Sequence, residues 1–205
     1  SIYSNTSTGG SFVTPSLLTG SLISPVAPLL AAPNSFTLAN GEQTVRSCAT
    51  GMFDSLNPTQ EVLVLGSGVV DHDSDTGTQN DGVISFYRRT AANTYVYQNS
   101  VLAINVNPPG MRDTLWGDAL ATVDVDAAGA QELFVGAPND SSAGSNAGAV
   151  YGYGVTTVSS NFILTDLGSY YYGGSDLANN GAGSGIAAAN IWGHSDTKQD
   201  LIVGA

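Results

Sequence analysis

Short apolar segments, separated by Gly, Asn and Asp, recur along most of the chain. Ala119–Val125 (ALATVDV), Ala149–Tyr153 (AVYGY) and Asn161–Gly168 (NFILTDLG) have largely period-two spacing. Such spacing places apolar side chains on one face of an extended strand. No window has the apolar spacing of an amphipathic helix. The pattern therefore predicts an all-β protein built from short strands.

Three of the apolar segments end in a glycine followed by a small residue. They are Glu61–Ser67 (EVLVLGS), Glu132–Pro138 (ELFVGAP) and Asp200–Ala205 (DLIVGA). Their landmark glycines, Gly66, Gly136 and Gly204, are 70 and 68 residues apart. A nearly constant spacing over three copies indicates a structural repeat. Each of these segments is apolar on both faces, which is expected for a strand packed between neighbouring sheets.

A second landmark follows the first two copies. Gly82–Tyr87 (GVISFY) and Gly148–Tyr153 (GAVYGY) are 66 residues apart, and Ser1–Asn5 (SIYSN) is similar to the end of this element. The Pro- and Ala-rich stretch Ser21–Asn40 accounts for a longer first interval as an inserted loop. Four short strands in each period of about 70 residues are typical of a β-propeller blade.

The segment Trp116–Tyr153 resembles an FG-GAP repeat, the blade unit of integrin α-subunit propellers. Trp116-Gly117 stands in the place of Phe-Gly, and Gly136-Ala137-Pro138 is the GAP motif. Ser184-Gly185 is interpreted as repeating the first motif in the last copy, and Arg46-Ser47 replaces it in the first. The resemblance implies propeller blades of four antiparallel strands, about three of them in an incomplete ring.

The repeat divides the chain into five expected segments. They are outer strands of a preceding blade (1–20), an inserted loop (21–45), a degenerate blade (46–105), a well-matched blade (106–170) and the inner strands of a further blade (171–205). Such a stretch does not close a ring by itself. We expect the remaining blades to come from the same longer chain or from a partner chain.

The FG-GAP resemblance also implies a calcium loop between the first two strands of a blade. Residues 124–132 fit it with Asp124, Asp126 and Glu132, while Ala128 replaces one ligand position. Carboxylates at alternate positions of a turn converge on one cation, and Gly129 permits the turn. The alternative is a solvated turn in which Asp124 caps backbone amides. The equivalent loops keep Asp54 in the first copy, and His194, Asp196 and Asp200 in the last, and are interpreted as structural turns.

Two further groups are candidate binding residues. Asp71, Asp73 and Asp75 have the carboxylate density of a calcium turn, or form an exposed acidic loop. Tyr170, Tyr171 and Tyr172 precede two glycines, and such a cluster stacks on a sugar or anchors a protein partner, or packs between blades.

The net charge of −12 makes nucleic acid and anionic membranes unfavourable partners. No apolar stretch is long enough to span a bilayer. Cys48 is the single cysteine and is interpreted as a buried small hydrophobic residue. The sequence has no nucleophile elbow, HExxH, CxxC or P-loop pattern, which disfavours an enzyme.

We therefore expect a non-catalytic, extracellular or cell-surface binding module with a protein or glycan ligand on its loop face. Two alternatives stay open. One is a structural subunit of an extracellular or surface assembly, and the other is an accessory domain of a secreted hydrolase.

Overall fold

The computed structural model describes eleven stretches of the chain. These are residues 3–4, 16–17, 45–53, 59–70, 80–91, 94–106, 113–126, 129–158, 160–171, 178–191 and 198–205. The regular elements within them are β-strands and one 3-10 turn at Ala103–Asn105, which confirms the all-β prediction. No described helix is long and apolar enough to cross a membrane.

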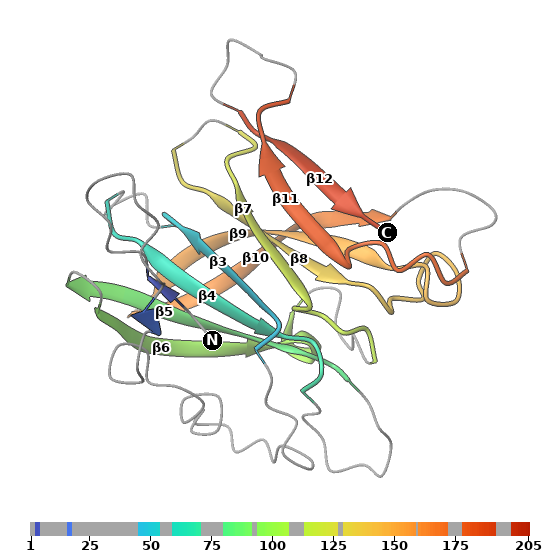
Figure 1. The fold of residues 1–205 in the computed structure, drawn as a ribbon, viewed down its shortest axis with the longest axis horizontal. Coiled ribbons are helices and arrows are strands. Elements are labelled where there is room, and N and C mark those ends of the chain that lie inside the picture. Colours follow the sequence, from blue (N-terminus) through green and yellow to red (C-terminus); the bar gives the residue numbers. More distant parts are fainter. Residues whose placement is uncertain are drawn as a thin grey trace.

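The strands form two four-stranded antiparallel sheets and two smaller pairs (Figure 1). The first unit contains β3 (Ser47–Gly51), β4 (Val62–Ser67), β5 (Val83–Ala91) and β6 (Thr94–Leu102) in that order. The second unit contains β7 (Ala119–Val123), β8 (Glu132–Ala137), β9 (Ala149–Val158) and β10 (Asn161–Tyr171) in the same order. The third unit pairs β11 (Gly185–Ala189) with β12 (Asp200–Gly204), and β1 (Tyr3–Ser4) pairs with β2 (Ser16–Leu17).

The strand register repeats between units. Each landmark glycine lies opposite the first residue of the preceding strand: Ser47 faces Gly66, Ala119 faces Gly136, and Gly185 faces Gly204. The outer two strands of both large sheets also carry a bulge at the same place. The sheet pairing skips Gln98 of β6, opposite the Phe86–Tyr87 step of β5, and Leu167 of β10, opposite the Gly152–Tyr153 step of β9. The sequence repeat is therefore a structural repeat.

The second strand of each large sheet is completely buried, as its sequence predicted. All six residues of β4 and all six of β8 are buried. Val64 on β4 and Val135 on β8 belong to one core that lies between the first and second units. Phe134 points the other way and packs with Leu201 and Val203 of the third unit. Alternate residues of β8 thus join the second sheet to the first unit on one face and to the third unit on the other.

Aromatic side chains fill the outer part of the core between the two large sheets. Phe86 stacks on Phe162 with ring centroids 4.9 Å apart, and Phe53 meets Phe86 edge-on at 6.4 Å. The guanidinium of Arg88 lies 5.2 Å from the centre of the Phe162 ring. Burying one such phenyl ring contributes roughly 2–3 kcal/mol. The core therefore holds the first and second units together over their whole width.

Glycines set how closely successive units approach. A Cβ on Gly66 would lie 2.3 Å from the carbonyl oxygen of Gly117, and one on Gly136 would lie 2.0 Å from that of Gly183. Such distances leave no room for any side chain. Since both landmark glycines make the same contact with the next unit, they are present to allow close packing of the backbones.

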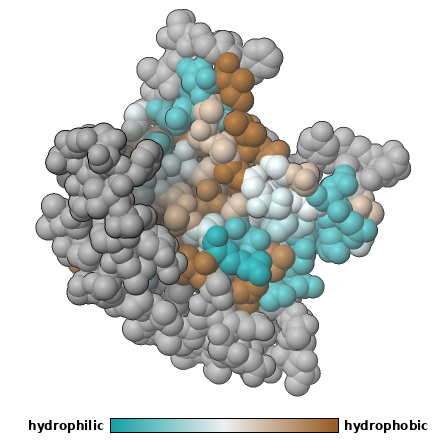
Figure 2. Space-filling view, viewed as in Figure 1, coloured by the Kyte–Doolittle hydropathy of each residue, from teal (hydrophilic) through white to brown (hydrophobic). Residues whose placement is uncertain are grey.

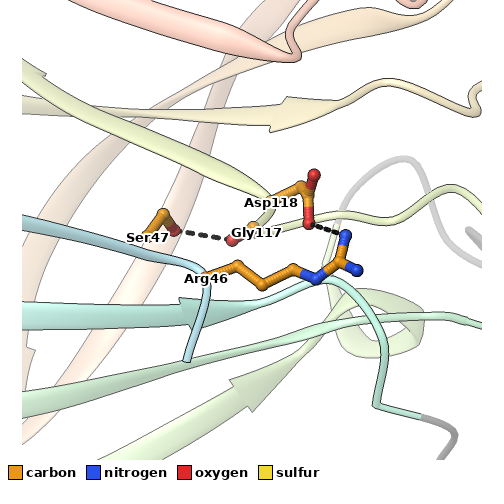
Figure 3. Close-up of polar contacts among 4 residues, drawn as sticks. All are labelled: Arg46, Ser47, Gly117 and Asp118. Atoms are coloured by element: carbon orange, nitrogen blue, oxygen red, sulfur yellow. Dashed lines mark hydrogen bonds and ion pairs between the residues drawn. The ribbon is translucent and has the colours of Figure 1, made fainter. Parts of the chain in front are cut away.

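The first strands β3, β7 and β11 lie side by side, although they are far apart in the sequence (Figure 1). Polar contacts join the start of β3 to the segment before β7 (Figure 3). The Ser47 hydroxyl donates to the carbonyl oxygen of Gly117 at 2.7 Å, and Arg46 pairs with Asp118 at 2.9 Å. The Thr122 hydroxyl donates to the Thr50 carbonyl at 2.7 Å.

Two details of the sequence interpretation were wrong. The counterpart of Gly117 is Gly183, not Gly185: both have left-handed φ angles, of 95° and 88°, and both donate their amide to the landmark glycine of the same unit. Cys48 is exposed rather than buried. It lies on β3, at the edge of the first sheet, where alternate side chains do not reach the core.

Candidate functional site

The candidate site is the turn between β7 and β8. Val123 ends β7 and Glu132 begins β8, so the antiparallel pairing brings Asp124 and Glu132 next to each other. Gly129 has a φ of 87°, a left-handed conformation that glycine adopts without strain. Ala128, expected to interrupt the ligand pattern, lies outside the described residues.

Three carboxylates converge at this turn. One oxygen from each of Asp124, Asp126 and Glu132 lies within 4.8 Å of the others. Asp126 is exposed, Asp124 is half-buried and Glu132 is only 8% exposed. Oxygen ligands at such spacing suit a hard divalent cation such as calcium. The structure therefore brings together the three residues that the sequence proposed as one metal site.

Glu132 is held in place by its own turn. Its Oε2 accepts a hydrogen bond of 2.9 Å from the Val125 amide. Burial raises the pKa of the Glu132 carboxyl, and repulsion from Asp126 and Asp124 raises it further, against the lowering effect of the Val125 amide. A cation at this position would offset both the burial and the repulsion.

The next unit fixes this turn through a glutamine. The amide of Gln199 donates to the Asp124 carbonyl at 3.0 Å, and its Oε1 accepts from the Asp124 amide at 3.2 Å. Gln131 makes the same pair of bonds with Met52 of the first unit, each 3.0 Å long. Because each glutamine satisfies both backbone groups of one residue, it fixes the position of the first-strand end relative to the next sheet.

The corresponding turns lack the full acidic set. In the third unit, the Asp200 carboxylate accepts from the Ile191 amide at 2.9 Å, as Glu132 does from Val125. Asn190 stands in the place of Asp124 there, and Val62 stands in the place of Glu132 in the first unit. The acidic residue at the start of the second strand therefore closes the turn whether or not the other carboxylates are present.

Several candidate residues lie outside the described part of the chain. They are Asp54, Asp71, Asp73, Asp75, Tyr172, His194 and Asp196. Tyr170 and Tyr171 form the end of β10 rather than a loop, and they pair with Val150 and Ala149. Their side chains are not among those described.

A second loop, not singled out as a site by the sequence, lies at the other end of the second unit. Residues 139–147 connect β8 to β9, whereas the acidic turn lies at the start of β8. Asp140 is 3% exposed and accepts hydrogen bonds from the Ser142 amide at 2.8 Å and from the Tyr151 hydroxyl. The three residues that follow Asp140 are exposed: Ser141, Ser142 and Ala143.

This loop is also tied to the third unit. Asn146 accepts from the Gly181 amide at 3.2 Å, and Ser145 accepts from the Asn179 amide at 2.8 Å. The loop is therefore a shaped, supported surface, which is the property that a recognition loop needs. In the sequence, only the run of one aspartate and two serines, Asp140-Ser141-Ser142, pointed to this loop.

Comparison with known proteins gives no assignment. No protein-family model matches the sequence, and no curated protein matches it.

Proposed function

We propose that the chain forms successive blades of an integrin-like β-propeller that acts as an extracellular or cell-surface binding module, without catalysis. The observation that carries the proposal is the repeated contact between units: Gly66 and Gly136 approach the backbone of the next unit in the same way. A sheet packed face to face on its predecessor, with first strands adjacent, is the arrangement that propeller blades require.

Ligand binding is proposed for the loop face that contains residues 139–147. Asp140 supports the exposed Ser141 and Ser142 from below, so a ligand would meet a preformed surface. The small and polar side chains suit a glycan or a protein surface with matching hydrogen-bond groups. The acidic chain, with a net charge of −12, disfavours an anionic ligand.

Immobilised chain tests the binding proposal. It is probed with an array of neutral oligosaccharides and with collagen and fibronectin. Saturable binding that the double substitution Ser141→Glu and Ser142→Glu abolishes would support it, with Thr156→Glu, at an exposed position further along β9, as a control away from the loop. Absence of binding to every probe would contradict it. Polymerisation of the purified chain would instead favour a structural subunit.

Calcium is proposed as a stabilising ion at Asp124, Asp126 and Glu132. The support is the 4.8 Å spacing of the three carboxylates and the burial of one of them. At the opposite end of β8 from loop 139–147, the ion would hold the turn and leave recognition to the loop. We assign the ion a structural role, because it would neutralise the repulsion among the three carboxylates that close the turn.

Thermal unfolding with excess calcium and with a chelator tests this site. Calcium at about one hundred times its dissociation constant stabilises the native state by about 2.7 kcal/mol, a rise in Tm of roughly 5–10 °C. Glu132→Gln should remove most of the rise and keep the bond to Val125. Asp200→Asn changes the third-unit turn that has the same closing bond, and this variant should keep the calcium-dependent rise in Tm. Equal shifts in both variants would indicate unspecific binding to an acidic protein.

A further inference from the structure

Three backbone hydrogen bonds join the segment before β11 to the loop between β8 and β9. The amides of Asn179, Gly181 and Ala182 donate to the carbonyl oxygens of residues 145, 146 and 147, at 2.8, 3.2 and 3.0 Å. The bond from Gly181 is the longest of the three. Figure 2 shows hydrophilic residues gathered on the right of the view, where Figure 1 places these two segments. The contact therefore lies at the surface of the molecule.

The middle of this contact contains an Asn-Gly step. Asn180 is exposed, and Gly181 has a left-handed φ of 64°. A Cβ on Gly181 would have the Pro138 carbonyl oxygen as its nearest neighbour, 3.9 Å away, so the position is open. The other Asn-Gly step of the sequence, Asn40-Gly41, lies outside the described residues. Because glycine has no Cβ, its backbone nitrogen is the least hindered one for attack on the side-chain amide of a preceding asparagine.

The reaction that this step permits needs no partner except water. The Gly181 nitrogen loses its proton and attacks Cγ of Asn180. The new N–Cγ bond closes a succinimide ring, and the Cγ–Nδ2 bond breaks to release ammonia. Water then opens the ring at either carbonyl. Opening at Cγ gives aspartate, and opening at the main-chain carbonyl gives isoaspartate, in which the backbone runs through Cγ and is longer by one methylene.

The reacting nitrogen is also the donor of the bond from Gly181 to Asn146. While that bond is formed, the Gly181 N–H is held by the Asn146 carbonyl and is not free to lose its proton. Reaction therefore requires local opening of the contact, and its rate follows the population of the open state. The succinimide nitrogen carries no hydrogen, and isoaspartate moves the Asn179 and Gly181 donors apart. Neither can form the three bonds in their present register.

We propose that Asn180 is a self-modification site, and that its conversion to isoaspartate disconnects the loop between β8 and β9 from the third unit. The change runs in one direction because ammonia leaves. It therefore records how long, and how often, the contact has been open. The proposal rests on the contact between the two segments and not on the proposed ligand or calcium ion. Failure of the binding or calcium test leaves it standing, and the reverse also holds.

Ageing of the purified chain at mildly alkaline pH tests the chemistry. Peptide mapping by mass spectrometry should show at Asn180 the mass change expected when an amide NH2 becomes a hydroxyl. An isoaspartyl methyltransferase should label the same peptide. The synthetic peptide Ala178–Gly185, which lacks the contact with Asn146, should react at least about tenfold faster than the folded chain. Asn180→Gln should stay unmodified, because its longer side chain would have to close a larger ring.

A matched pair of glycine variants tests the dependence on opening. Gly148→Ala places a Cβ 2.2 Å from the Ala182 nitrogen, so it should loosen the contact and speed modification of Asn180 by at least about fivefold. Gly129→Ala has a similar left-handed φ, 87° against 80°, with nothing within 4 Å of its Cβ, and should leave the rate unchanged. Circular dichroism checks both folds. If Gly148→Ala does not fold, the wild-type chain in urea below its unfolding midpoint replaces it, and the rate should rise with urea concentration.

Amide hydrogen exchange of the modified chain tests the disconnection. Ion exchange isolates the isoaspartate form, which carries an additional negative charge. Protection of Asn179 and Ala182 should fall by at least about tenfold, while that of β4 stays unchanged. Asn180→Asp, measured before ageing, carries the same charge without the added methylene and should keep the protection of Ala182.

Three results would overturn the proposal. The first is no modification of Asn180 in the folded chain under conditions in which the peptide reacts completely. The second is an equal rate in the folded chain and in the peptide, which would mean that the contact does not control the reaction. The third is unchanged protection of Ala182 in the isoaspartate form, which would mean that the loop stays connected.

Discussion

At the scale of single residues, the lack of a side chain at a landmark glycine allows two backbones to approach closely. Gly136 lies so near the Gly183 carbonyl that a methyl group at its α-carbon would overlap the oxygen, at 2.0 Å. Because the obstacle is backbone and not a flexible side chain, the clash can be relieved only by moving a whole strand.

Gly136→Ala is therefore expected to lower the free energy of unfolding by about 3 kcal/mol or more. The matched control is Gly185→Ala, since nothing lies within 4 Å of a Cβ at that position. That variant should change stability by less than about 1 kcal/mol. Urea unfolding of both variants gives the comparison, and equal effects would contradict the close approach of the two units.

The Tyr87 hydroxyl is buried without a hydrogen-bond partner among the described residues. Burial, with a smaller contribution from Tyr97, raises the pKa of Tyr87 to about 12 from 10.0. Between pH 10 and pH 12 the unfolded state therefore loses the phenolic proton before the native state does. The stabilisation is complete below about pH 10 and is lost as the pH rises through 12.

Tyr87→Phe removes this ionisation. Over the same pH range the wild type should lose roughly 2–3 kcal/mol more stability than the variant. Near neutral pH the variant should be as stable as the wild type or more stable by up to about 1 kcal/mol, because an unpartnered hydroxyl is removed. Tyr97→Phe, which loses a bond to Ser100, should keep most of the pH dependence. Urea unfolding at several pH values measures the difference.

At the scale of strands, Asn99 on β6 connects the outer edges of the two large sheets. Its Nδ2 donates to the Phe162 carbonyl at 2.9 Å, and its Oδ1 accepts from the Phe162 amide at 2.8 Å. One side chain therefore satisfies both backbone groups of a residue in another sheet. Near the first strands, Gln131 and Gln199 do the same with one side-chain oxygen and one backbone amide each.

Asn99→Ala should lower stability by roughly 2–3 kcal/mol, because it leaves two partly buried backbone groups unpaired. Gln98→Ala is the control, since within the described stretches the Gln98 side chain bonds to nearby backbone carbonyls, of Val96 and Tyr97. Its expected effect is below about 0.5 kcal/mol. Thermal unfolding of both variants tests this. Similar losses of stability would mean that any substitution on β6 is destabilising, and that the Asn99–Phe162 bonds are not the cause.

The sequence predicted the strands and the repeat because these depend on alternation and on glycines that recur at one spacing. It also predicted that β4 and β8 would be buried on both faces. The contacts of Asn99 and Gln131 were not predictable, since a polar residue on a strand gives no signal of its partner. Gly183 was misplaced because the motif Gly-Ala-Gly-Ser-Gly offers three glycines, and only the backbone angle distinguishes them.

At the scale of the whole molecule, the first and second units share one core. Val64 comes from the first unit, Val135 from the second, and both are fully buried in the same cluster. The third unit contributes residues that are only partly buried. We therefore expect the two large sheets to unfold together, and β11–β12 to open at lower free energy.

Val64→Ala tests this cooperation. A loss of about 2 kcal/mol should reduce the amide protection of β4 and β8 by the same factor, roughly thirtyfold, and leave that of β12 unchanged. Ile202→Ala, at a site that is 42% exposed, is the control and should have little effect on β8. Reduced protection confined to β4 would show that the sheets are independent.

The glutamine contacts run in one direction: Gln131 reaches back to Met52, and Gln199 reaches back to Asp124. The two surfaces of a sheet are consequently different: one carries the glutamine, and the other carries the backbone groups that the next glutamine bonds. A contact of this kind has no twofold axis, so it is heterologous. Each addition repeats the same rotation and the same shift along its axis, and these two quantities decide between a closed circle and an endless spiral.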